Sequence, residues 1–212
     1  MGYNTMEKID LKKELKHLYN ASVKEVGLVD VPAMNFLLID GAGDPNTAQE
    51  YKDAIEALYG LAYTLKFRLK KGELARDYGV PPLEGLWWTE DMANFSAEDK
   101  AAWKWTMLIM QPEFVTLEHV NEARAELEKK KNPVALPKIR FEAFEEGLSA
   151  QIMHLGPYAA EAPTIEKLHH FIQTNGYRLS GKHHEIYLSD PRKAAPEKMK
   201  TIIRQPIEKV ES

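Results

Sequence analysis

Apolar and polar stretches along the first half of the chain follow the order strand, helix, strand, strand. The apolar run at 36–39 is typical of a buried strand, and Gly41 marks its end. Apolar residues at helical spacing across 54–65 predict a helix, with Thr47 as its N-cap. Two further strands are expected after it, over 83–88 and 103–111.

The second half repeats this order after a helix over 116–130 that connects the halves. The expected elements are a strand over 138–146, a strand over 148–155, a helix over 163–174, and strands over 183–189 and 201–207. Short sequence matches support a duplication. The helices share the pattern Ile-Glu-x-Leu at 55–58 and 165–168, and the last strands share Gln-Pro at 111–112 and 205–206.

We therefore predict an α+β fold built from two pseudo-symmetric strand-helix-strand-strand modules. Residues 23–131 and 132–212 are the expected modules of one domain spanning 23–212, and residues 1–22 are expected to form a helical N-terminal extension. The modules would form an antiparallel sheet with helices on one face. The open face of the sheet, or the seam between the modules, would then hold a ligand cleft.

Composition narrows the classes of function. Hydrophobic residues make up 44% of the chain and the net charge is −4, with lysine and arginine scattered rather than gathered. This predicts a globular protein without a nucleic-acid partner. No stretch approaches the roughly 20 apolar residues of a membrane helix, and the N-terminus lacks a signal-peptide pattern. The absence of cysteine excludes disulfides and thiolate chemistry, and we expect a cytoplasmic protein.

Glu185 is the sharpest candidate for a functional residue. In the predicted strand, Ile186 and Leu188 alternate with Glu185 and Tyr187, so the last two share one face. If the apolar pair packs on the helices, the carboxylate stands on the floor of the cleft, where burial would raise its pKa and a bound cation would favour its charge. The alternative is a solvated glutamate on an open sheet face.

All four tryptophans lie on two strands that are expected to pair. Trp105 and Met107 share a face by alternation, whereas Trp87 and Trp88 point opposite ways, so one of these two should join the cleft. Aromatic faces stack on planar molecules and attract cations. The alternative is that the rings are ordinary core.

The remaining motifs indicate no metal and no cofactor. The seven histidines include no pair with the i, i+4 spacing of a helical zinc site. The chain also lacks a complete glycine-rich phosphate loop and a serine nucleophile elbow. Hydrolases of the serine, cysteine and zinc types are therefore not expected.

Three motifs in the second half resemble the GyrI-like small-molecule-binding family. They are Gly-Pro-Tyr at 156–158, Glu-Ile-Tyr-Leu-Ser-Asp-Pro at 185–191 and Thr-Ile-Ile-Arg-Gln-Pro-Ile at 201–207. The family includes the DNA gyrase inhibitory protein and the effector domains of multidrug-sensing transcription activators. The resemblance implies a hydrophobic cleft whose buried glutamate, matched here by Glu185, meets cationic aromatic drugs. Tyr158 matches the tyrosine of the Gly-x-Tyr turn.

The tryptophan-rich strands resemble a stand-alone branch of that family. Its members bind dyes and other lipophilic cations, and some hydrolyse the cyclopropane of DNA-alkylating natural products. The resemblance thus makes Glu185 a candidate water-orienting residue or general base, and Tyr187 a candidate partner for the ligand's carbonyl group. Only about 23 residues precede the resemblance, too few for a DNA-reading domain, so direct transcriptional control is not expected.

Two functions stay open on this basis. The favoured one is binding of aromatic or cationic molecules, and the alternative is a hydrolase that detoxifies cyclopropane-containing alkylators. Both use the same residues: Trp87, Trp88, Trp105, Met107, Tyr158, Glu185 and Tyr187. Inhibition of gyrase would rest on fold analogy alone. We expect no membrane partner, and the sequence leaves monomer and homodimer open.

Overall fold

The computed structural model describes residues 8–90 and 100–210 and has an α+β fold. The helices are α1 (Leu11–Glu14), α2 (Lys16–Tyr19), α3 (Gln49–Lys71), α4 (Leu117–Lys130) and α5 (Ala162–Thr174). The strands are β1 (Gly27–Val31), β2 (Met34–Ala42), β3 (Leu83–Trp88), β4 (Lys104–Gln111), β5 (Arg140–Phe144), β6 (Gly147–Leu155), β7 (Tyr177–Leu179), β8 (His183–Tyr187) and β9 (Lys200–Lys209). Within the described ranges, no helix is long and apolar enough to cross a membrane.

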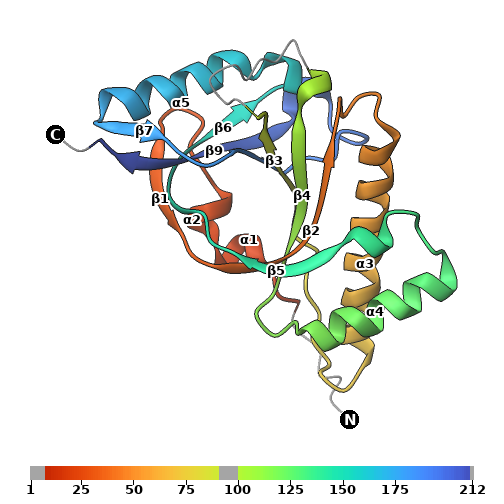
Figure 1. Cartoon of the computed structure of the whole chain (residues 1–212). Coiled ribbons are helices and arrows are strands. Elements are labelled where there is room, and N and C mark those ends of the chain that lie inside the picture. Colours follow the sequence, from red (N-terminus) through yellow and green to blue (C-terminus); the bar gives the residue numbers. More distant parts are fainter. Residues whose placement is uncertain (1–7, 91–99, 211–212) are drawn as a thin grey trace.

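The strands form one antiparallel sheet whose order repeats the predicted duplication (Figure 1). Along the sheet the order is β1-β6-β9-β8-β3-β4-β2-β5, and β7 pairs with β9. In each half the first strand pairs with the last, and the last pairs with the middle strand, giving β2-β4-β3 and β6-β9-β8. The two middle strands, β3 and β8, then join the halves, with Gly85 opposite Glu185. This topology confirms the predicted α+β fold.

The two long helices of the halves pack on the same face of the sheet. The buried side of α3, which includes Leu58 and Leu61, packs with β2 and β4, and α5 packs on β6, β7 and β9. Helix α4 lies against the outside of α3 (Figure 1). The seam between β3 and β8 therefore lies between the strands that α3 covers and the strands that α5 covers.

The N-terminal helices cover the opposite face of the sheet. Leu18 and Tyr19 of α2 belong to a core cluster with Leu86, Ile186 and Ile202. The predicted alternation on β8 is thus present, but Ile186 faces α2, whereas Glu185 lies on the side of α3 and α5. Both faces of this central strand are covered, so a pattern of apolar residues on one side could not identify which helices lie there.

Local signals set most element boundaries as expected. Thr116 caps α4 by accepting a hydrogen bond from the backbone N–H of His119. The prediction for α3 was wrong by one residue, because its N-cap is Ala48 and no side chain caps it. Strand β7, only three residues long, was not predicted.

Candidate functional site

Glu185 lies at the centre of the sheet, where the two halves meet. Its neighbours across the strands are Gly85 on β3 and Ile203 on β9. The side chain is 15% exposed. Its Oε2 accepts a hydrogen bond from the hydroxyl of Tyr187 at 2.7 Å, and its Oε1 lies 3.1 Å from Nε2 of His183. The carboxylate is therefore oriented by two side chains of its own strand.

A chain of hydrogen bonds connects Glu185 to the tryptophan of the neighbouring strand. Trp87 Nε1 donates to the Tyr187 hydroxyl at 3.0 Å, and that hydroxyl donates onward to Glu185. The bond crosses above Gly85. A Cβ at this position would lie 2.8 Å from Trp87 Nε1 and 3.1 Å from the Tyr187 oxygen. A glycine is thus needed for the indole and phenol to meet over the seam.

Aromatic rings from three further parts of the chain gather around this hydrogen-bond chain. Tyr187 meets Tyr158, in the 3₁₀ turn Tyr158–Ala160, edge to face at 5.5 Å between ring centroids. On the other side, Tyr51 of α3 lies 6.0 Å from Trp87 and 5.3 Å from Trp105, and Trp103 lies 5.4 Å from Trp87. We call Tyr51, Trp87, Trp103, Trp105, Tyr158 and Tyr187 the aromatic cluster.

A second carboxyl group, which the sequence reasoning missed, lies beside Glu185. Glu161 is the residue before α5 and is only 5% exposed, and its Oε1 has no hydrogen-bond partner among the described residues. Burial, together with the negative charge of Glu185, raises the pKa of Glu161 to about 9. An acid just before a helix is usually a solvated cap or dipole partner, so no sequence pattern indicated that this one turns inward.

Glu185 titrates in the opposite direction. Burial alone would raise its pKa, but the contacts from His183, Tyr187 and Glu161 outweigh burial and lower the pKa below its ordinary value. The pair therefore holds one negative charge near neutral pH, with the proton on Glu161 and the charge on Glu185.

The tyrosines of the site remain protonated donors. Burial, with the nearby charges of Glu161 and Glu185, raises the pKa of Tyr158 to about 12, and burial with the Glu185 charge raises the pKa of Tyr187 well above its ordinary value. Neither phenol is thus a nucleophile near neutral pH. Both serve as hydrogen-bond donors and ring surfaces.

The structure brings only some of the predicted site residues together. Glu185, Tyr187, Trp87 and Tyr158 form one group. Trp105 and Met107 share that face but are completely buried in the core with α3, and the Trp105 ring fills the space that a Cβ on Gly41 would occupy. These two side chains therefore belong to the core beneath the site.

Trp88 lies on the other face of β3. Its ring packs with the core cluster around α2, and Nζ of Lys182 lies 3.3 Å from the ring centroid. The register of β3 and β8 therefore brings Trp87, rather than Trp88, to Glu185.

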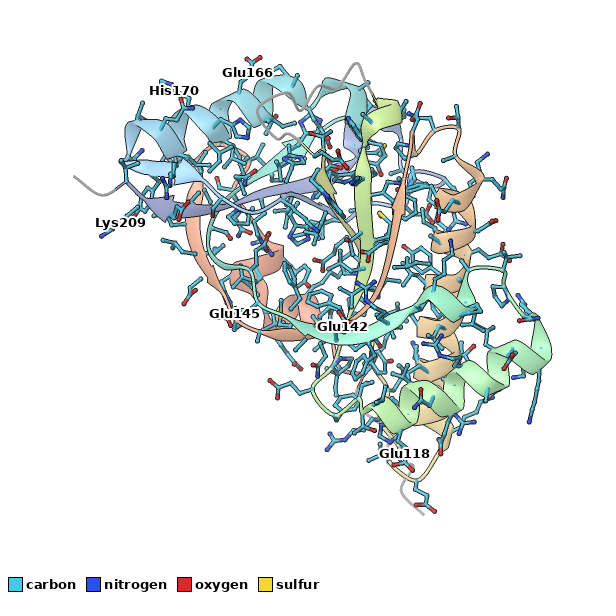
Figure 2. The ribbon with its side chains drawn as sticks, viewed as in Figure 1. Glu118, Glu142, Glu145, Glu166, His170 and Lys209 are labelled. Carbon is cyan, nitrogen blue, oxygen red and sulfur yellow. The ribbon has the colours of Figure 1, made fainter. Side chains whose placement is uncertain are left out.

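The acids at and near the start of α5 differ in their exposure to solvent. Glu166 and His170 point away from the sheet into solvent (Figure 2). Glu161, at the start of the helix, is buried instead. Within the described ranges, no group of three or more His, Asp or Glu side chains is arranged to hold a metal ion.

A second polar cluster lies directly behind Glu185, on the face covered by α2. His184 lies 2.9 Å from Glu84 and 2.9 Å from Glu146, while Arg204 pairs with Glu146 at 3.1 Å and the Tyr19 hydroxyl donates to Glu84 at 2.7 Å. We call these five residues the His184 network. Burial would lower the pKa of His184, but the two carboxylates outweigh it and raise the pKa to about 9.

The family model for the GyrI-like small molecule binding domain matches residues 24–208. The crystal structure of an uncharacterized conserved protein from Listeria innocua is 45% identical, with a TM-score of 0.89, and covers 95% of this chain and 100% of that chain. The structure of a hydrolase from the same organism is 44% identical, with a TM-score of 0.83 and the same coverage. No curated protein matched the sequence.

A more distant structure shares the fold alone. The EcmrR C-terminal domain is 14% identical with a TM-score of 0.56, covering 88% of this chain and 98% of that chain. The family match spans nearly the whole described chain and includes all the residues that converge on Glu185, which confirms the resemblance found in the sequence. The chain belongs to the GyrI-like small-molecule-binding family.

Proposed function

We propose that this chain binds planar aromatic organic cations beside Glu185, at the seam where β3 and β8 pair. The observation that carries this proposal is a charged carboxylate held within a cluster of aromatic rings. The Glu185 side chain is 15% exposed, and no lysine or arginine of the described residues forms an ion pair with it.

The charge of Glu185 is not matched by a lysine or arginine of the described residues. A buried carboxylate is costly unless a positive charge or several hydrogen bonds compensate it. Here two side chains supply hydrogen bonds, and the surrounding rings offer faces that attract cations by about 0.5–2 kcal/mol each. A flat cation would satisfy both the carboxylate and the rings, whereas a neutral ligand would satisfy only the rings.

The family match supports binding of a small molecule in general terms. The class of ligand, the aromatic residues that touch it and a role in tolerance of drugs or toxins are parts of this proposal. Of the rings, Tyr158 is 40% exposed and is the one most accessible to a ligand that approaches Glu185.

The test compares two ligands of nearly the same shape. Tryptophan fluorescence is followed at about pH 7.5 as the protein is titrated with N-methylacridinium, a permanent cation, or with acridine, which is neutral at that pH. We expect Glu185→Gln to weaken N-methylacridinium by about tenfold or more and to leave acridine within about twofold. Glu166→Gln removes an exposed acid from α5 and is the matched control. Equal losses for both ligands, or none, would contradict the role of Glu185.

A hydrolase is the second candidate, favoured by the name of the Listeria innocua hydrolase structure, which is 44% identical over 95% of this chain. In this proposal Glu185 takes a proton from water while the water oxygen bonds to a cyclopropane carbon. The carbon–carbon bond breaks, and its electron pair moves through the conjugated ring to the carbonyl oxygen, which takes up a proton. Because Tyr187 donates to Glu185, its role in this step is to hold the carboxylate.

The two candidates are separated by turnover. The protein is incubated with a cyclopropane-containing alkylator, and mass spectrometry follows the product that has gained one water. Product in excess over protein, reduced about 10²–10⁴-fold in Glu185→Gln, would support the hydrolase. Binding without any water adduct would leave ligand binding as the function.

A further inference from the structure

Two carboxyl groups from different elements meet in the interior of this protein. Glu185 comes from the middle of β8, and Glu161 comes from the residue before α5. Glu161 is only 5% exposed, and no ion pair of the described residues includes it. Its Oε1 is a buried oxygen without a hydrogen-bond partner among these residues.

The groups that face Glu161 supply little positive charge. They are Glu185 and Tyr187 from β8, Thr201 from β9 and Tyr158 from the 158–160 turn. His183 of β8 and Tyr51 of α3 act on Glu185, and His169 of α5 faces His183. Neither lysine nor arginine is among them, and the Thr201 hydroxyl also has no partner within the described ranges. Two buried carboxylates at close range cannot both be charged unless a cation joins them.

We propose that Glu161 carries a proton that a bound aromatic cation displaces, so that the site binds cations with release of one proton and binds neutral molecules without it. This inference rests on the proposed ligand site beside Glu185. It assigns Glu161 a role in ligand selection. Loss of the proton makes the site more negative when a cation binds, and the proton stays in place when a neutral molecule binds.

The consequence is a specific dependence on pH. While Glu161 is protonated in the free protein and ionised in the complex, the affinity for a cation should rise by about tenfold per pH unit. The rise should level off above about pH 9, where the free protein has already lost the proton. The affinity for a neutral ligand should stay constant or fall over the same range, because such a ligand favours the protonated form.

Calorimetry measures the proton directly. N-methylacridinium is titrated into the full chain at about pH 7.5 in phosphate and in Tris, whose heats of ionisation differ, and the dependence of the binding enthalpy on buffer gives the number of protons released. We expect close to one proton for N-methylacridinium and close to none for acridine. Glu161→Gln should release none with either ligand, and its affinity for the cation should no longer rise with pH.

Each failure has its own meaning. If Glu161→Gln still releases a proton, the proton comes from another group, and the inference is wrong. Binding of the cation through Glu185 with no proton release in the unmodified protein would overturn the role of Glu161 while leaving the proposed function intact. If neither ligand binds, or if Glu185→Gln changes nothing, both proposals are wrong. Cation binding without proton release in the unmodified chain overturns the role of Glu161 even if a variant folds poorly.

Discussion

The two faces of β8 carry acidic clusters that are built in opposite ways. Behind the strand, the His184 network combines two carboxylates with a histidine and an arginine, and each of these charged groups has a partner within 3.1 Å. On the face toward α3 and α5, His183 contacts Glu185, and no lysine or arginine of the described residues pairs with Glu161 or Glu185. The His184 network is thus charge-balanced within the fold, whereas the proposed cation would supply the positive charge that lysine and arginine do not supply to Glu161 and Glu185.

The His184 network also has an evident structural task. Arg204 donates to the backbone oxygen of Leu18 at 2.7 Å, and Gln151 donates to the backbone oxygen of His17 at 2.8 Å. Tyr19 donates to Glu84 from the same helix. The network therefore attaches α2 to the sheet and closes this face.

The largest expected effect breaks the satisfied cluster. Arg204→Met should lower the free energy of unfolding by about 3–5 kcal/mol, because the buried Glu146 keeps only His184 as a partner and the Leu18 oxygen loses its buried donor. Urea unfolding followed by circular dichroism measures the change. Arg178→Met is the control, since Arg178 pairs with Glu208 at the surface and should cost less than about 1 kcal/mol. Equal losses in the two variants would remove the distinction between the clusters.

Stability should fall as the pH rises from about 6.5 to about 9. The pKa of His184 is raised from 6.5 to about 9 on folding, so the folded state holds this proton more tightly. The stabilisation is complete below about 6.5 and is lost by about pH 9, at an upper limit of about 3 kcal/mol. Glu161, with a folded-state pKa of about 9, acts in the same direction. Urea unfolding at several pH values checks this slope.

Glu161→Gln separates the two contributions. Glutamine keeps the neutral form at every pH, so the variant should be more stable than the unmodified protein by about 1–3 kcal/mol near pH 8 and nearly equal to it near pH 4. The remaining slope would then belong to His184. A variant that is less stable near pH 8 would show that Glu161 is part of the architecture, as the acids of the His184 network are.

A smaller effect is expected from Gly85→Ala. The added methyl group would crowd Trp87 Nε1 at 2.8 Å and the Tyr187 oxygen at 3.1 Å, and so weaken the hydrogen bond that holds Tyr187 against Glu185. Affinity for N-methylacridinium should fall about 5–10-fold, because the methyl group would displace both side chains in addition to weakening their hydrogen bond. Gly27→Ala is the control, because a Cβ there would meet no atom within 4 Å. Unchanged affinity in Gly85→Ala would place the ligand elsewhere.

The smallest effect compares the adjacent tryptophans. Trp87→Phe removes the donor to Tyr187 but keeps a ring, so cation affinity should fall about three- to fivefold. Trp88→Phe changes only the opposite face, under Lys182, and should leave affinity within about twofold. Fluorescence of the bound acridinium gives both values. The reverse order would mean that the ligand binds on the α2 side of the sheet.

The sequence by itself determined what depends on local geometry. Alternation along β8 placed Glu185 and Tyr187 on one side, and the repeated element order predicted the two halves of the sheet. It also separated Trp87 from Trp88, because neighbouring residues of a strand always point to opposite faces. These features follow from a few consecutive residues and are therefore visible in any one segment.

Only the tertiary structure decided which groups meet. The register that sets Gly85 opposite Glu185 brings Trp87 to Tyr187 across 100 residues of chain, and the packing of α5 turns Glu161 inward beside Glu185. Glu161 looks like an ordinary acid at a helix start, and its proton is held by burial and by a charge 24 residues away. Burial and electrostatic coupling are properties of the assembled interior, so no local pattern could have specified them.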